Sequence, residues 1–364
     1  MARACSGVLE LLYIDLRVHC VLSIPPSNMA SKTAAEAPRT AGYVAPSAGI
    51  FRVTPAAWIP YAELMRLDRA AGYYAFYWHY AIGIAFTSCI ADVPPQPVEV
   101  AKLAGYLALW VVFYRGAVCA WNDNIDQEFD RQVARCRNRP IARDAVSTTQ
   151  GHVFTVALAI ICAAMLAPFP MAVWLYVGVM TLMLAVYPFG KRVTDFPQVI
   201  LGFAFAIPIV MCSTAFGTEP LPQDFWTGQT LFTPKAYSAM CLYGANTLWT
   251  IVFDTVYAHQ DIKDDIKAGV KSLAVRLGSH TKLGLGILAS VQTVLLAATG
   301  LLADLGWAFF MLGCGGAGIS LFAMLALVDL EKPASCAWWF GPGSRIVGAS
   351  VVSGLLGTYL LRWC

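Results

Sequence analysis

Residues 103–130 read LAGYLALWVVFYRGAVCAWNDNIDQEFD, an apolar run that ends in a cluster of acidic and amide side chains. The apolar part carries one charged residue, Arg115. It is long enough for a helix to cross the hydrocarbon core of a bilayer, which takes roughly 20 residues. This stretch therefore predicts a membrane-spanning helix that presents carboxylates at one end.

Similar apolar runs recur along the whole chain of 364 residues, of which 58% are hydrophobic and only 13% charged. An ordinary soluble domain has roughly a quarter of its residues charged. We predict an all-α integral membrane protein with about nine spans. The spans are expected at 72–92, 99–121, 151–168, 170–188, 196–214, 235–254, 283–303, 305–328 and 343–361.

Two parts of the chain are expected. Residues 56–364 should form one transmembrane domain, since no long polar linker divides the spans. Residues 1–55 should be a disordered or non-core tail, because 25–50 are rich in Ala, Pro, Ser and Gly.

Basic residues follow the even-numbered spans. The segment after the second span holds Arg131, Arg135, Arg137, Arg139 and Arg143, and the segment after the sixth holds Lys263, Lys267, Lys271, Arg276 and Lys282. By the positive-inside rule these segments, 122–150 and 255–282, are predicted to be cytosolic. The formal net charge of +3 is too small to suggest a nucleic-acid partner.

Two stripes of carboxylates lie at the ends of the second and sixth spans. Asn122, Asp126 and Asp130 are spaced four apart, so they share one helical face that Asp123 adjoins. The second stripe consists of Asp254, Tyr257, Asp261 and Asp265, also on one face. Like charges at this spacing repel unless a cation lies among them, and a solvated helix end is the alternative for either stripe alone.

Both stripes are expected at the same membrane depth, where they can oppose each other. Two oxygen-rich walls suit Mg²⁺, which prefers a few carboxylates together with phosphate oxygens and water. The predicted ligand is a diphosphate. Mg²⁺ and cationic side chains would stabilise its departure, so that an allylic C–O bond ionises and an electron-rich aromatic carbon captures the cation away from water.

Cationic partners for a diphosphate occur nearby. Arg115 lies in an apolar run on the face of Asn122, where an unpaired guanidinium is costly, so we assign it a functional role. Lys191, Arg192 and Lys271 lie at the predicted cytosolic rim. Simple anchoring of the helices at the interface is the alternative for these three, and also for Arg66 before the first span.

These motifs resemble the UbiA superfamily of intramembrane aromatic prenyltransferases over roughly residues 60–360. The NDxxDxxxD motif is matched by Asn122, Asp123, Asp126 and Asp130, and the second motif by Tyr257, Gln260, Asp261, Asp264 and Asp265. The resemblance implies a fold of nine transmembrane helices around a central cavity capped by cytosolic loops. It agrees with the span count reached from the apolar runs.

The resemblance also implies residue roles. Mg²⁺ and the diphosphate would be held by Asn122, Asp123, Asp126, Asp130, Asp261 and Asp265, of which all but Asp123 are expected to be catalytic. Substrate binding would involve Arg66, Arg115, Lys191, Arg192, Asp254, Tyr257 and Lys271. The expected partners are a prenyl diphosphate, an aromatic acceptor and the lipid bilayer, and we expect no protein partner.

The stretch Arg139-Pro140-Ile141-Ala142-Arg143 is similar to the fungal branch that makes meroterpenoids. Farnesyl diphosphate and a phenolic polyketide acid, such as an orsellinic acid derivative, are the expected substrates, in the endoplasmic reticulum or another internal membrane. The alternatives are a 4-hydroxybenzoate polyprenyltransferase of ubiquinone biosynthesis, a membrane terpene cyclase and a cation transporter. Transporters usually place acids near the bilayer midplane within inverted repeats, and no such repeat is evident here.

Overall fold

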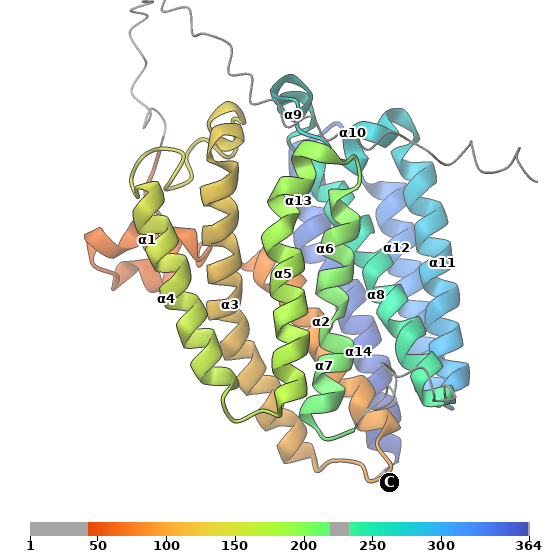
Figure 1. Cartoon of the computed structure of the whole chain (residues 1–364). Coiled ribbons are helices and arrows are strands. Elements are labelled where there is room, and N and C mark those ends of the chain that lie inside the picture. The colour runs from red at the N-terminus through yellow and green to blue at the C-terminus, as the bar shows by residue number, and fades with distance from the viewer. Residues whose placement is uncertain (1–42, 219–232, 363–364) are drawn as a thin grey trace, which may run out of the picture. The chain divides into compact units, whose positions relative to one another are not determined.

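The computed structural model describes residues 43–218 and 233–362. The chain divides into two units, Met1–Pro38 and Arg39–Cys364, and all described residues belong to the second. Within them every regular element is helical (Figure 1). The all-α prediction is therefore confirmed.

The long helices follow the predicted spans. They are α2 (Ala70–Ile90), α3 (Pro97–Gln132), α4 (Thr148–Leu166), α5 (Met171–Val193), α6 (Pro197–Ala206) continued by α7 (Pro208–Ala215), α8 (Pro234–Ala258), α11 (Thr281–Leu302), the π-helical η5 (Phe309–Gly315) continued by α12 (Gly316–Leu327), and α14 (Ser344–Leu361). The shorter elements are η1 (Gly49–Arg52), η2 (Ala56–Trp58), α1 (Ile59–Leu64), α9 (Ile262–Ala268), α10 (Leu273–Leu277), η4 (Gly278–His280), α13 (Pro333–Trp338) and η6 (Trp339–Gly343).

Seven helical segments in the described part of the chain are long and apolar enough to cross a membrane. The predicted count of nine is thus approximate, and α2 and α8 make the difference. Both lie largely inside the bundle, where α2 buries His79 and α8 buries Asn246 and Thr250. The polar side chains lower the mean hydropathy of α2 and α8. Because these side chains face other helices rather than lipid, both helices still fit within a membrane bundle.

The helices form a bundle in which α8 packs against α6 and α11, α2 against α7 and α14, and α3 against α4 (Figure 1). Large apolar side chains such as Ile160, Leu182 and Ile319 are exposed on the outside. A soluble protein rarely exposes apolar surface of this extent, and lipid is the solvent that suits it.

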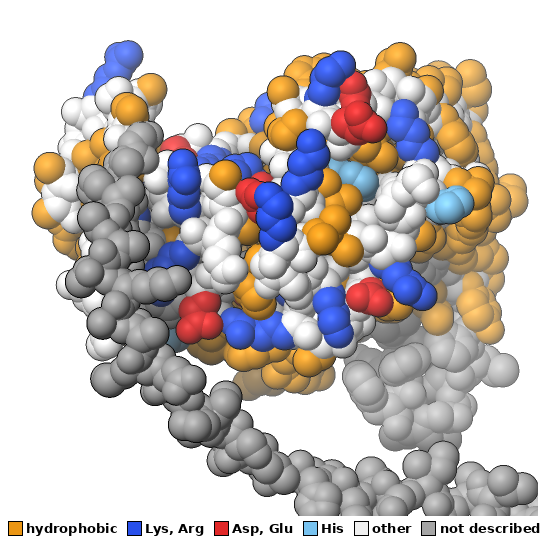
Figure 2. Space-filling view, turned by 90° about the horizontal axis from the view of Figure 1, so that it is seen from above, with side chains coloured by type: hydrophobic (Ala, Val, Ile, Leu, Met, Phe, Trp, Pro, Cys, Tyr) orange, Lys and Arg blue, Asp and Glu red, His pale blue; other side chains and the backbone are white. Residues whose placement is uncertain are grey.

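The carboxylate-bearing ends of α3 and α8 lie at one end of the bundle, together with α9 and α10 at the top of Figure 1. Figure 2 views this end directly and shows Lys and Arg side chains spread across it, with acidic side chains among them. This charged end is where the chemistry expected from the sequence must take place.

The last residues of the expected tail, 43–55, contain η1 and bury Phe51. The Tyr43 hydroxyl donates a hydrogen bond to Glu63 at 3.0 Å, and the Tyr43 ring contacts the guanidinium of Arg143. The rest of the predicted tail, residues 1–42, lies outside the described residues.

A close helix contact depends on Gly83 of α2. A β-carbon at this position would lie 2.6 Å from the carbonyl oxygen of Pro208, at the start of α7. Pro208 also explains why α6 and α7 are separate elements, since proline has no N–H to continue the helical ladder.

We predict that Gly83→Ala destabilises the bundle by about 1–3 kcal/mol, because the added methyl group overpacks the contact with α7. Gly105→Ala is the matched control, since a β-carbon added to Gly105 would meet no atom within 4 Å. Thermal unfolding of the purified protein in detergent measures both. Equal melting temperatures for the two variants would show that α2 and α7 are not so tightly packed.

Candidate active site

The two carboxylate stripes line one cavity of about 180 Å³ at the charged end of the bundle. We call it the carboxylate cavity. Nine of the residues singled out in the sequence line it, namely Asn122, Asp126, Asp130, Lys191, Asp254, Tyr257, Asp261, Asp265 and Lys271. They come from α3, α5, α8, the turn between α8 and α9, α9 itself and the segment after α9. The expectation that the ends of α3 and α8 oppose each other therefore agrees with the structure.

The wall contributed by α3 centres on Asp126. Its Oδ2 accepts hydrogen bonds of 2.6 Å from Lys191 Nζ and of 2.6 Å from Asn122 Nδ2. Its Oδ1 is buried and has no hydrogen-bond partner. A buried carboxylate oxygen without a hydrogen-bond partner is costly, so Asp126 Oδ1 can accept a further cation or hydrogen-bond donor.

The opposite wall is joined to the α3 loop by Arg135. Its Nε donates to Asp261 Oδ1 and Oδ2 at 2.9 and 3.0 Å, and its Nη1 donates to the Tyr257 hydroxyl at 2.8 Å. Arg135 therefore links the segment that follows the first motif to two residues of the second. This ion pair fixes the distance between the two walls.

Asp265, on α9, is one of two acids of the cavity that have no ion-pair partner among the described residues, and Asp254 is the other. None of the described residues donates a hydrogen bond to the Asp265 carboxylate or forms an ion pair with it. Burial, and then the neighbouring Asp261 carboxylate, raise the pKa of Asp265 to about 7. A bound cation would favour the ionised form and release its proton.

The described residues contain no ready-made group of three or more His, Cys, Asp or Glu side chains that could hold a metal ion. The reason is that most of the acids already have cationic partners: Lys191 for Asp126, Arg139 for Asp130 and Arg135 for Asp261. The free oxygen of Asp126 and the uncompensated carboxylate of Asp265 nevertheless fit Mg²⁺, which takes only a few protein oxygens when phosphate supplies the others.

Asp123, which was expected among the metal ligands, lies outside the lining of the carboxylate cavity and is only 2% exposed. Arg66 Nη2 donates to its two oxygens at 2.6 and 2.8 Å, and Arg139 Nη1 donates to Oδ1 at 3.2 Å. Neighbouring positions on a helix diverge by about 100°, so Asp123 faces α1 and the start of α2 instead of the cavity.

Three cations expected to bind substrate also lie outside the cavity lining. Arg66 is paired with Asp123, and Arg115 donates to the backbone oxygens of Arg66 and Arg69 at 3.1 and 2.9 Å. Arg192 donates to the backbone oxygen of Ile125 at 2.7 Å. Their charges are used to hold the segment before α2 and the end of α5 against α3.

Sequence reasoning missed the role of Arg135 and Arg139. Both line the carboxylate cavity, and Arg139 Nη1 donates to Asp130 at 2.7 and 2.9 Å. The sequence indicates them only as part of the basic cytosolic segment. Their spacing of four residues, directly after an acidic stripe, was the available signal, since it suits a cationic cover over that stripe.

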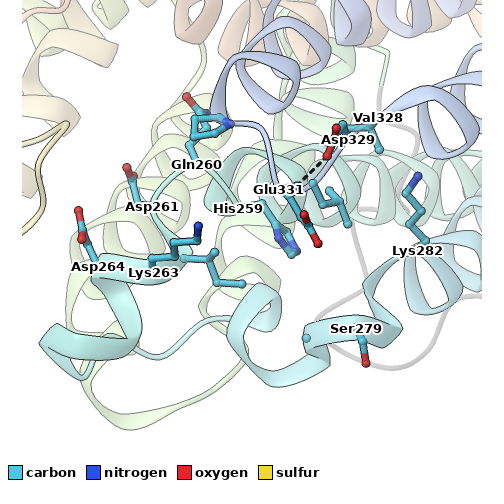
Figure 3. Close-up of a pocket in the computed structure, with 14 residues that line it drawn as sticks. His259, Gln260, Asp261, Lys263, Asp264, Ser279, Lys282, Val328, Asp329 and Glu331 are labelled. Atoms are coloured by element: carbon cyan, nitrogen blue, oxygen red, sulfur yellow. Dashed lines mark hydrogen bonds between the residues drawn. The ribbon is translucent and has the colours of Figure 1, made fainter.

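A second and larger cavity of about 1060 Å³ lies on the other side of Asp261. Figure 3 shows His259 between the side chains of α9 and Lys282 of α11. Another wall of this second cavity is formed by residues 328–331, which include Asp329 and Glu331. Asp261 lines both cavities and therefore lies at their boundary.

A sequence profile of the UbiA prenyltransferase family matches residues 80–348, which include both carboxylate stripes. The chain belongs to this family. The predicted resemblance is confirmed, and the apolar exterior of this UbiA family member makes it a multi-pass integral membrane protein.

Fungal prenyltransferases are among the similar proteins. A prenyltransferase of Acremonium egyptiacum, ascA, is 40% identical over 296 residues, which cover 79% of this chain and 82% of the relative. A prenyltransferase of Stachybotrys bisbyi, stbC, is 36% identical over 332 residues, or 90% of this chain and 94% of the relative. The expected likeness to the fungal branch of the family is thereby confirmed.

Solved structures of archaeal proteins share the fold. A UbiA homolog from Aeropyrum pernix superposes with a TM-score of 0.61 at 18% identity, covering 79% of this chain and 98% of the other. A homolog from Archaeoglobus fulgidus, bound to GPP and Mg²⁺, has a TM-score of 0.59 at 19% identity, covering 82% and 99%. These neighbours confirm the UbiA-type fold.

We predict that Asp123→Asn and Asp265→Asn damage the UbiA protein in different ways. Asp123→Asn leaves Arg66 and Arg139 without their shared counter-charge, so the free energy of unfolding should fall by about 3–5 kcal/mol. Asp265→Asn breaks no ion pair and should leave the melting temperature unchanged while turnover is lost. Thermal unfolding in detergent and product formation, measured on both variants, test this contrast. Equal melting temperatures for the two variants would contradict a structural role for Asp123.

Proposed function

We propose that this UbiA family member transfers a farnesyl group from farnesyl diphosphate to an aromatic carbon of a phenolic polyketide acid, such as an orsellinic acid derivative, in meroterpenoid biosynthesis. The observation that carries the proposal is the carboxylate cavity. Two stripes of acids from α3 and α8–α9 face each other there, with Lys191 and Lys271 in the same lining. Such a mixture of acids and cations suits a magnesium diphosphate and little else.

Different residues of the carboxylate cavity would have different roles in the reaction. Asn122, Asp126, Asp130, Asp261 and Asp265 would hold Mg²⁺, which neutralises charge on the departing diphosphate when bound. Lys191 and Lys271 would add donors to the phosphate oxygens. Arg135 and Arg139 sit in the same lining and can move from the acids to the phosphates when these enter.

The start of the prenyl chain would meet aromatic and weakly polar side chains. Tyr187, Asp254 and Tyr257 form the part of the lining furthest from α9 along α5 and α8. Aromatic faces stabilise a developing allylic cation, and exclusion of water prevents its capture by solvent. Asp254 lines the same cavity and would accept a proton from the acceptor ring in the final step, which restores aromaticity.

The names of the relatives support the prenyl transfer. The basic end of the bundle supports a cytosolic active site, by the positive-inside rule, in the endoplasmic reticulum or another internal membrane (Figure 2). A 4-hydroxybenzoate polyprenyltransferase of ubiquinone biosynthesis is the alternative within the family. A terpene cyclase would need no acceptor, and a cation transporter would need no diphosphate.

Mass spectrometry of products separates these alternatives. Membranes that contain the protein are incubated with farnesyl diphosphate and a panel of acceptors, including orsellinic acid and 4-hydroxybenzoate. We expect a farnesylated phenolic acid. Exclusive conversion of 4-hydroxybenzoate with a long polyprenyl donor would assign the protein to the quinone pathway instead, and a cyclised terpene without acceptor would make it a cyclase.

The two carboxylate stripes should act as one metal-dependent unit. Asp126→Ala and Asp261→Ala should each reduce turnover by about 10²–10³-fold, because either change leaves diphosphate charge uncompensated in the transition state. The double variant should be scarcely worse than either single one, since groups that act as a unit are not additive. The measurement is turnover across a series of Mg²⁺ concentrations, and a sample treated with chelator serves as the metal-free control. Activity that persists in chelator would refute the metal-dependent mechanism.

A further inference from the structure

Gln198, the second residue of α6, lines the carboxylate cavity and is only 2% exposed. Its Oε1 accepts a hydrogen bond of 3.1 Å from the backbone N–H of Leu273. Because a backbone N–H can only donate, this contact sets the orientation of the amide and leaves Nε2 as its other atom. None of the described residues accepts a hydrogen bond from Nε2. Gln198 therefore brings an oriented and unused donor group to the cavity.

Ser272, in the segment between α9 and α10, is a second residue of this kind. It is 5% exposed and also lines the carboxylate cavity. Its Oγ accepts a hydrogen bond of 3.2 Å from the backbone N–H of Val275, in the first turn of α10. This contact does not use the hydroxyl proton, and none of the described residues accepts it. A serine hydroxyl has one proton to donate, so Ser272 supplies a second unused donor.

Backbone hydrogen bonds hold the two donors close to each other. The N–H of Leu273, directly after Ser272, is bound to Gln198. The N–H of Lys271, directly before Ser272, donates to the backbone oxygen of Lys191 at 2.9 Å. The segment that carries Ser272 is thus fastened to the end of α5 and to the start of α6. Donors that are held in this way need little rearrangement when a ligand binds.

The donors of the carboxylate cavity differ in how far they are already engaged. Each of three cations of the lining forms an ion pair with a carboxylate, namely Lys191, Arg135 and Arg139. Gln198 Nε2 and the Ser272 hydroxyl have no acceptor among the described residues, and a buried donor without an acceptor is costly. The first turn of α6 lies at the same wall, so the positive end of its helix dipole does too. These features favour an anion that offers several oxygens.

We propose that Gln198 Nε2 and the Ser272 hydroxyl bind phosphate oxygens of the prenyl diphosphate. This inference rests on the proposed function and adds two uncharged residues to its diphosphate site. Because neither donor is engaged with an acid, both can contact the phosphates without the loss of an ion pair. The carboxylate of the acceptor has similar oxygens, and binding of a phosphate ligand in the absence of acceptor separates the two sources.

Binding of inorganic pyrophosphate with Mg²⁺ tests the assignment without acceptor, prenyl chain or turnover. Isothermal titration is carried out on the purified full-length protein in detergent. Gln198→Met keeps the size of the side chain and removes its donor, and Ser272→Ala removes the hydroxyl. Each variant should raise the Kd for magnesium pyrophosphate about tenfold, because a hydrogen bond to a charged group contributes that much. The Kd for farnesyl thiodiphosphate should rise by the same factor, since the contact is with the phosphates.

Conservative variants separate contact with the ligand from support of the fold. Gln198→Glu keeps an oxygen for the N–H of Leu273 and loses the donor, so it should bind pyrophosphate weakly at an unchanged melting temperature. Val270→Asp adds a negative charge to the same lining without removing a donor, and Gln198→Glu should raise the Kd at least about threefold more. Ser272→Thr keeps the hydroxyl and the contact with Val275, and it should retain the affinity.

The outcomes that overturn the proposal are distinct. Unchanged pyrophosphate affinity in folded Gln198→Met and Ser272→Ala removes both residues from the diphosphate site. If Gln198→Met fails to fold, equal losses of affinity in Gln198→Glu and Val270→Asp have the same meaning. A raised KM for the phenolic acid with unchanged pyrophosphate binding assigns the donors to the acceptor carboxylate instead. Failure of the unaltered protein to bind either phosphate ligand overturns the proposed function as well. Normal binding with no acceptor prenylated overturns the proposed function alone.

Discussion

Acidic side chains buried at the end of a membrane bundle need nearby positive charge, and this requirement organises the whole charged end of the protein. Asp126 is compensated by Lys191 of α5, and Asp261 by Arg135 of the segment after α3. Each pair joins elements that are distant in sequence. Because an uncompensated buried carboxylate is costly, these contacts fix how α3, α5 and α8 meet.

The same requirement extends away from the cavity. Arg66, Asp123, Arg139 and Asp130 form a chain of alternating charges that ends in the cavity lining. Arg66 has a positive φ of 57°, a conformation that costs free energy for any residue with a β-carbon. Its backbone oxygen is held by Arg115. The segment before α2 is thus fastened to the first motif by the charges it carries.

Compensation by protein cations also suits a site for a charged substrate. Lys191, Arg135 and Arg139 neutralise the acids, and in the proposed function they would turn to the phosphate oxygens of a bound diphosphate. Asp265, whose pKa is raised to about 7, has no ion-pair partner among the described residues, and neither has Asp254. The site therefore combines paired acids with two carboxylates that no described cation contacts directly.

Helix periodicity and span length depend only on the local order of residues, so the helical membrane fold, the two carboxylate stripes and the end of the bundle at which they lie could be predicted from the sequence. Which neighbour each helix face meets depends on packing between distant segments, and the folded structure was needed to show it. Asp123 and Asp126 are three positions apart in one motif, yet one pairs with Arg66 and the other faces the cavity. His79 of α2 likewise lies within hydrogen-bond distance of Asn246 of α8, because packing brings these distant segments together.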